Sequence, residues 1–203
     1  MKYGAISPSN RELFAMSVVR MKAAVSEGRG DIRVVEVAVP QPTAYQGLCK
    51  IEAAATCSGT DLKILSNKLP WKLEYPGIVG HESIGTVIET GSKVRAFREG
   101  DRYFRPTVTY AGSRHDGYTP ITGGFAEYGV ITDVRAMQED GLEPPGYAKF
   151  QMNVPADAGL DPGDATMLIT LKEVAGFVAN LNVTLNQQVV VLGAGSVAMA
   201  MVF

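Results

Sequence analysis

Short apolar runs, separated by glycine, proline and polar residues, characterise the chain as far as about residue 154. Runs that are rich in β-branched residues and bounded by turn residues are typical of β-strands. The pattern predicts five strands, over 32–37, 48–56, 85–90, 125–131 and 148–154. Strands at this spacing predict either a β-barrel or a β-sandwich.

The pattern becomes helical further along. Asp161 followed by Pro162 is a favourable helix start, because the acid can cap the helix and proline fits its first position. Apolar residues then recur at helical spacing, which predicts a helix to about Asn180. Segment 188–192 is apolar after its first residue, Gln188, as in a strand buried on both faces of a parallel sheet. The change predicts a domain boundary within 155–165.

The composition of the chain mainly excludes classes of protein and of partner. Hydrophobic residues make up 46% and charged residues 20% of the chain, as in ordinary globular proteins. The net charge of -2 gives no reason to expect nucleic acid or an anionic membrane surface as a partner. No window has the unbroken apolar length of a membrane-spanning helix. Residues 1–20 lack the apolar core of a secretory signal and are interpreted as an N-terminal extension.

The two cysteines, Cys49 and Cys57, fall in or directly after the strand predicted over 48–56. Eight residues of straight strand span roughly 26 Å, which is too far for a disulfide between them. A reducing, cytoplasmic setting is therefore expected.

A glycine-rich turn follows the last predicted strand. Residues 189–198 read Val-Val-Val-Leu-Gly-Ala-Gly-Ser-Val-Ala, a G-x-G-x-x-A pattern. Gly193 permits a tight turn and Gly195 lets the backbone approach a pyrophosphate, while the small Ala198 allows close helix packing. The N-terminus of the following helix would present free N–H groups to the phosphates. The pattern predicts a dinucleotide site, and the alternative is a glycine turn without a ligand.

The predicted cofactor-binding residues are Gly193, Gly195, Ser196 and Val197, and the predicted cofactor is NAD or NADP. The acid or arginine that distinguishes the two is expected about twenty residues further on, beyond Phe203. We therefore expect the chain to be the front part of an oxidoreductase, ending just inside its dinucleotide-binding domain.

Four motifs make this expectation more specific. Segments 56–63 (TCSGTDLK) and 76–82 (PGIVGHE) resemble the catalytic motifs of the medium-chain, alcohol-dehydrogenase-type dehydrogenases and reductases, and 100–102 (GDR) and 123–128 (GGFAEY) resemble strand signatures of the same family. The resemblance implies a mixed α/β protein. A GroES-like β-barrel catalytic domain would span 21–160, followed over 161–203 by the truncated start of a doubly wound parallel (Rossmann) sheet.

The resemblance also implies a reaction. In such enzymes a hydride passes between NAD(P) and an alcohol, polyol, aldehyde or ketone in the cleft between the two domains. A zinc ion polarises the oxygen of the substrate, and a hydroxyl beside the metal starts a proton relay to solvent. The expected partners are a small-molecule alcohol or carbonyl substrate and further copies of the chain, in a dimer or tetramer.

Site residues carry over by position. His81 matches the histidine ligand of zinc, and Glu82 matches the acid beside it. Asp61 matches the acid that orients the histidine. Thr60 matches the relay hydroxyl, and Lys63 stands where relatives can have a relay histidine.

Two positions depart from the family pattern. The ligand cysteine is expected at Ser58, and Cys57 lies one residue early. A slip of one residue on a strand turns a side chain to the opposite face, unless a β-bulge restores it. The other position that should carry an anionic ligand is Thr170, with Glu173 about one turn further on.

These departures leave a zinc-bound and a zinc-free site both open, with Cys57, His81 and Glu82 as the metal-ligand set. The polar segment 106–124 replaces the lobe that binds a structural zinc in many relatives. It contains no cysteine, so a structural zinc is not expected. His115 in this segment is interpreted as an exposed loop residue.

Two alternatives to a zinc-assisted dehydrogenase follow. One is a zinc-independent reductase of the quinone- or enoyl-reductase type, in which Ser58 or Thr60 would bind the carbonyl oxygen. The other is an inactive GroES-like fragment that acts only as a binding or assembly module.

Overall fold

The computed structural model describes residues 19–110, 112–154 and 159–202. The extension predicted over 1–20 lies outside these residues apart from its last two, and the boundary predicted within 155–165 lies partly outside. The strands are β1 (Arg20–Ser26), β2 (Arg33–Ala38), β3 (Gln46–Ala55), β4 (Gly77–Ile78), β5 (Glu82–Thr90), β6 (Arg102–Phe104), β7 (Thr119–Pro120), β8 (Tyr128–Thr132) and β9 (Met152–Val154). The helices are α2 (Thr60–Leu65), α3 (Val134–Glu139), α4 (Pro162–Asn180) and α5 (Ser196–Ala200), with a 3-10 helix at Gly146–Phe150.

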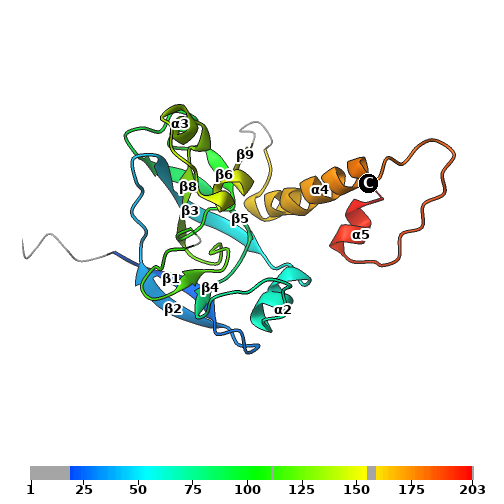
Figure 1. Cartoon of the computed structure of the whole chain (residues 1–203), viewed down its shortest axis with the longest axis horizontal. Helices are drawn as coiled ribbons and strands as arrows, with labels where there is room; N and C mark the ends of the chain where they lie inside the picture. The colour runs from blue at the N-terminus through cyan, green and yellow to red at the C-terminus, as the bar shows by residue number, and fades with distance from the viewer. Residues whose placement is uncertain (1–18, 111, 155–158, 203) are drawn as a thin grey trace, which may run out of the picture.

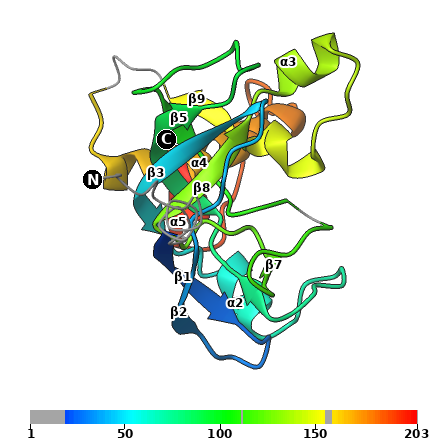
Figure 2. The same ribbon diagram turned by 90° about the vertical axis from the view of Figure 1, so that its left-hand side faces the viewer.

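The strands form two sheets. One has the order β2-β1-β4-β7 and the other the order β8-β3-β5-β6-β9. The segment just before β8 joins them, because Ala24 of β1 donates to the carbonyl of Phe125, and Glu127 bonds through its backbone to both Lys22 and Ile51. Figure 2 shows β3 and β8 on one side of this junction and β1 and β2 on the other. The expected mixed α/β class is confirmed, with the barrel built as two joined sheets rather than one closed ladder.

Alternating burial along β1 builds the core between the sheets. Met21, Ala23 and Val25 are buried and pack in one cluster with Val37 of β2 and Ile78 of β4. Burying such a side chain contributes roughly 1.5–3 kcal/mol. The cluster therefore holds the four-stranded sheet to the rest of the body.

Helix α4 has the limits that the sequence predicts. The Asp161 side chain accepts a bond from the backbone N–H of Gly163, which caps the helix, and Pro162 is its first residue. Ile169 packs in one cluster with Ile84 of β5 and Phe104 of β6. The first half of α4 is therefore fixed to the five-stranded sheet, while its far end projects from the body (Figure 1).

Two predicted strands are shorter than expected. The strand predicted over 125–131 begins only at Tyr128, because the residues before it bond to both sheets. The strand predicted over 148–154 begins only at Met152, after the 3-10 helix that follows Pro145. The described residues of segment 106–124 are irregular as predicted, apart from β7.

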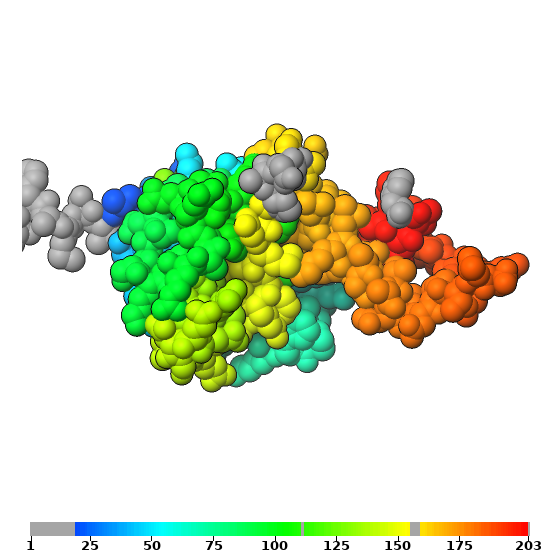
Figure 3. Space-filling view, turned by 90° about the horizontal axis from the view of Figure 1, so that it is seen from above, coloured from blue at the N-terminus to red at the C-terminus, as the bar shows by residue number. Residues whose placement is uncertain are grey.

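The strand predicted over 188–192 does not form. Its backbone is irregular, and Val190 and Leu192 are 80% and 92% exposed. A parallel strand needs a neighbour for its ladder of hydrogen bonds, and none lies beside this segment within the residues that the structure describes. The helix after the glycine turn does form, as α5, directly after Gly195. Figure 3 shows this part of the chain projecting away from the two sheets.

Asp133 ties α3 to the loop after β5. Its side chain is buried, with the residue 2% exposed, and it accepts bonds from the backbone N–H groups of Ala136, Arg95 and Ala96 at 2.9, 2.7 and 2.8 Å. Burial alone would raise the pKa of this carboxyl. The three N–H donors and the charge of Arg95 outweigh burial and hold the pKa below its usual value.

We expect Asp133→Ala to lower the free energy of unfolding by about 2–3 kcal/mol at pH 7, since it removes a helix cap and two further charge-assisted bonds. A depressed folded-state pKa stabilises the fold above the unfolded-state pKa of about 3.9, and this stabilisation is lost as the pH falls through the folded-state value. Urea unfolding between pH 7 and pH 3 should therefore show a smaller acid-induced loss of stability in the variant. Glu89→Ala, which removes an exposed carboxylate of β5, should change stability by less than about 0.5 kcal/mol. Equal acid sensitivity of wild type and Asp133→Ala would contradict this role.

Candidate metal and active site

The turn between β3 and α2 positions Cys57 through Asp61. The backbone N–H of Asp61 donates to the carbonyl of Cys57 at 2.8 Å, and the backbone N–H of Cys57 donates to Asp61 Oδ2 at 2.8 Å. These reciprocal bonds fix the backbone of Cys57 just outside the end of the strand.

The same aspartate orients His81. Asp61 Oδ1 lies 3.0 Å from His81 Nδ1, and both side chains are largely buried. A carboxylate can only accept a hydrogen bond, so Nδ1 is the donor, and in the neutral imidazole the lone pair is then on Nε2. A carboxylate in this place is the usual partner of a metal-binding histidine.

Glu82 completes the group from the first residue of β5. It is buried, and its Oε1 accepts a bond from Thr170 Oγ1 of α4 at 2.8 Å. One possible ligand atom from each of Cys57, His81 and Glu82 lies within 4.8 Å of the others. We call these three residues the donor cluster.

Cys57 lies on the more buried side of the segment that continues β3. The pairing of β3 with β5 shifts between Ile51 and Ala53, so that Glu52 is an extra residue in the ladder. The strand ends at Ala55, but exposure still alternates beyond it, so that Cys57 is more buried than its neighbours Thr56 and Ser58. Its thiol joins the donor cluster, while Ser58, at the position expected for the ligand, is exposed.

The remaining predicted catalytic residues lie beside the cluster in sequence but do not bond to it. Ser58 and Lys63 are exposed, and Thr60 is half-buried at the start of α2. Within the part of the chain that the structure describes, no hydrogen bond links these side chains to the donor cluster.

The predicted cofactor residues lie at the far end of the molecule, around the start of α5. Gly193 has a φ of 136°, a conformation that residues with a Cβ rarely adopt. Gly195 precedes the helix, and Ser196 and Val197 are its first two residues. The turn chemistry expected from the sequence is therefore present without the strand expected before it.

Sequence reasoning missed Arg105. Its backbone N–H donates to the carbonyl of Ser83 at 2.8 Å, its Nε donates to the carbonyl of His81 at 3.1 Å, and its Nη2 pairs with Glu173 of α4. The available signal was a charged residue directly after Tyr103 and Phe104 and before Pro106. His115 is likewise less exposed than expected, because its Nε2 lies 2.6 Å from the carbonyl oxygen of Ala38.

The donor set suits zinc. Cysteine sulfur, histidine nitrogen and a carboxylate oxygen are the ligands that zinc takes in proteins, and three of them with one open position are typical of catalytic sites. Both cysteines are free. Burial raises the pKa of Cys49 to about 12, so that thiol is inert, whereas Cys57 lies at the cluster.

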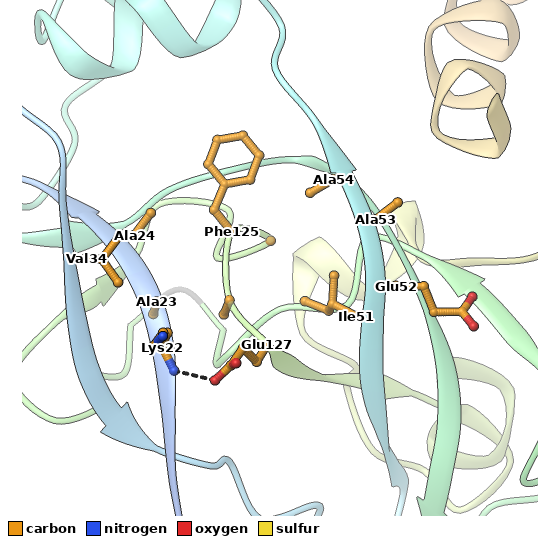
Figure 4. Close-up of a pocket in the computed structure, with 12 residues that line it drawn as sticks. Lys22, Ala23, Ala24, Val34, Ile51, Glu52, Ala53, Ala54, Phe125 and Glu127 are labelled. Carbon is orange, nitrogen blue, oxygen red and sulfur yellow. Dashed lines mark hydrogen bonds between the residues drawn. The ribbon is translucent and has the colours of Figure 1, made fainter. Parts of the chain in front are cut away.

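A hollow between the two sheets is a separate feature. It is open and apolar, has a volume of about 440 Å³, and lies between β1, β2 and β3. Figure 4 shows the small side chains of Ala24, Ala53 and Ala54 around Phe125, with the backbone of Lys22 bonded to the carboxylate of Glu127. No residue of the donor cluster lines it, so we do not assign the chemistry to it.

Among the described residues, no helix combines the length and apolar composition needed to span a membrane.

The chain is similar in sequence to known proteins. Residues 44–140 match the model of the alcohol dehydrogenase GroES-like domain. An alcohol dehydrogenase of Rhizobium meliloti strain 1021 is 35% identical over 126 residues, which are 54% of this chain and 37% of that protein. An acryloyl-coenzyme A reductase of Metallosphaera sedula is 37% identical over 114 residues, which are 53% of this chain and 34% of that protein.

Solved structures agree with these matches. A candidate zinc-binding dehydrogenase from Sinorhizobium meliloti 1021, bound to NADP, is 27% identical with a TM-score of 0.67. The match covers 91% of this chain and 52% of that protein. The chain thus spans about a third of the two curated relatives and about half of the solved structure.

Proposed function

Because the chain belongs to the medium-chain dehydrogenase/reductase family, we propose that it supplies the catalytic half of an oxidoreductase that transfers a hydride between NAD or NADP and an alcohol, polyol, aldehyde or ketone. The single observation that carries the proposal is the donor cluster. Its cysteine, histidine and carboxylate come from separate segments of the chain and meet within 4.8 Å. We further propose residues 21–160 as the catalytic domain and 161–203 as the beginning of the nucleotide-binding domain.

Cys57, His81 and Glu82 would hold a catalytic zinc ion. Such an ion supplies a Lewis acid that polarises the oxygen of an alcohol or carbonyl. Asp61 keeps His81 in the tautomer that leaves Nε2 free, and Thr170 fixes the carboxylate of Glu82. These two contacts preorganise the nitrogen and oxygen donors.

Thr60 and Lys63 are proposed to carry the proton away from the substrate hydroxyl, with Ser58 beside them. The exposure of Ser58 and Lys63 favours this, since a relay must end at solvent. At the other end of the chain, Gly193 and Gly195 are proposed to bring the backbone close to the cofactor pyrophosphate. Ser196 and Val197 would then present backbone N–H groups to it.

A second candidate is a zinc-independent reductase of a conjugated or quinone carbonyl. The hydroxyl residues Ser58 and Thr170 favour it, because they stand where two anionic ligands are expected. The similarity to an acryloyl-coenzyme A reductase also favours it. In this case the hydroxyl of Ser58 or Thr60 would bind the carbonyl oxygen of the substrate.

Elemental analysis and an activity assay on the same preparation of the protein, carrying a complete nucleotide-binding domain, separate the candidates. We expect one zinc per chain, and we expect a chelator to remove the zinc and alcohol oxidation by NAD(P)⁺ together. Zinc-free protein that still reduces an enoyl or quinone substrate with NAD(P)H would establish the second candidate instead. Protein that binds neither zinc nor NAD(P)H would contradict both and leave a binding or assembly module.

A further inference from the structure

We propose that Arg105 is a positioning residue that clamps helix α4 to the His81–Glu82 turn and thereby fixes the geometry of the donor cluster. The proposal rests on the proposed function, since it treats the cluster as a metal site. It deepens that function by adding a residue that contacts none of the reacting groups.

Arg105 bonds to the backbone on both sides of Glu82. Its N–H donates to the carbonyl of Ser83 at 2.8 Å, and its Nε donates to the carbonyl of His81 at 3.1 Å. The arginine side chain is only 12% exposed, so these bonds are shielded from water. A single residue therefore holds the backbone carbonyl groups of the two residues on either side of Glu82.

The other end of the guanidinium reaches α4. Its Nη2 pairs with Glu173, and three residues earlier on the same helix Thr170 donates to Glu82 Oε1 at 2.8 Å. Residues three apart lie on one face of a helix. One face of α4 thus holds the side chain of Glu82 directly and its backbone through Arg105, and a shift of α4 would move both.

The chemistry requires an arginine at this position. Its planar fork donates in two fixed directions at once, toward His81 and toward Glu173, whereas lysine offers one compact charge on a flexible stem. The residue has a φ of 60°, and its carbonyl accepts a bond from Gln151 Nε2 at 3.0 Å. Asparagine tolerates this left-handed conformation, so Arg105→Asn removes the fork while keeping the backbone accessible.

The test is cobalt(II) binding to the 203-residue chain, followed by visible absorption. We expect Arg105→Asn to weaken cobalt(II) binding by about tenfold or more, as is typical for residues that support a metal ligand. Arg105→Lys and Glu173→Gln should each weaken it by about three- to tenfold. The matched control is Glu52→Gln, which breaks the 2.9 Å ion pair with Arg102 on the same sheet, away from the cluster. It should leave affinity within about twofold.

Wild-type affinity and an unchanged cobalt spectrum in both Arg105→Lys and Glu173→Gln would overturn the proposal, as would an equal loss in Glu52→Gln. Thermal unfolding identifies variants that do not fold. If Arg105→Asn is one of them, Glu173→Gln decides, because its side chain is mostly exposed.

A readout without metal separates this proposal from the proposed function. The ¹⁵N signals of the His81 imidazole report its tautomer and its bond to Asp61. They should change in Arg105→Asn and Glu173→Gln but not in Glu52→Gln. If wild type binds no cobalt(II), the zinc part of the proposed function fails. The imidazole signals still decide on Arg105, and identical signals in all variants would overturn its positioning role.

Discussion

Cys57→Ser should lower the affinity of the chain for zinc or cobalt(II) by at least about 100-fold, more than the loss expected for a residue that only supports a ligand. The thiolate is the softest donor of the cluster and the ligand that best separates zinc from magnesium or calcium. Its loss leaves His81 and Glu82, which are too few for a tight site. The thiolate-to-cobalt absorption of the wild-type complex should also disappear.

Cys49 provides the matched control for this experiment. It is fully buried in β3, and burial raises the pKa of its thiol to about 12. Cys49→Ala should therefore keep both the affinity and the thiolate absorption, although it leaves a small cavity that reduces stability. Retention of the thiolate absorption in Cys57→Ser would show that Cys57 is not the sulfur ligand.

Gly80→Ala should lower the free energy of unfolding by about 3 kcal/mol or more. Gly80 has a φ of 96°, which is strained for any residue with a Cβ. An added Cβ would lie 2.4 Å from the ring of Phe125 and 2.5 Å from its backbone nitrogen. Backbone strain and overpacking each cost about 1–3 kcal/mol, and here both act directly before His81.

Urea unfolding of Gly80→Ala and Gly59→Ala measures this effect against a matched glycine. Gly59 has a φ of -72° at the start of α2, and an added Cβ there would meet no atom within 4 Å. Gly59→Ala should thus be neutral or stabilising by up to about 1 kcal/mol. Equal stabilities of the two variants would mean that the close approach of Gly80 to Phe125 does not constrain the site.

Features that depend on residues close together in the sequence were predicted correctly. The cap at Asp161 and proline at the next position predicted the start of α4, and the β-branched run at 32–37 predicted β2 to within one residue. The order of the family motifs predicted the GroES-like fold and the family. These features are local, and apolar periodicity with turn chemistry is sufficient to recognise them.

Features that depend on contacts between residues far apart in the sequence were harder to predict. Segment 188–192 has the composition of a buried strand but stays irregular, because composition does not supply the neighbour that a strand needs. No sequence motif marks Arg105 as a site residue. Its contacts form only because the fold brings the end of β6 beside the His81–Glu82 turn and α4. Its partners are 24 and 68 residues away.

Cys57 lies between these two cases. Its displacement from the family position was evident, and a slip of one residue was expected to turn the thiol away unless a β-bulge restored it. The structure shows an irregular pairing of β3 at Glu52 and places the thiol in the donor cluster. The irregular pairing leaves no pattern in the sequence, since it depends on how β3 aligns with β5.

Anomalous X-ray scattering at the zinc absorption edge, from crystals of the protein grown with zinc, tests the central claim most directly. We predict a single strong anomalous peak bonded to Cys57 Sγ, His81 Nε2 and a carboxylate oxygen of Glu82. An anomalous map without a peak at these three residues, or with zinc bound only elsewhere, would contradict the assignment of the donor cluster as a catalytic metal site.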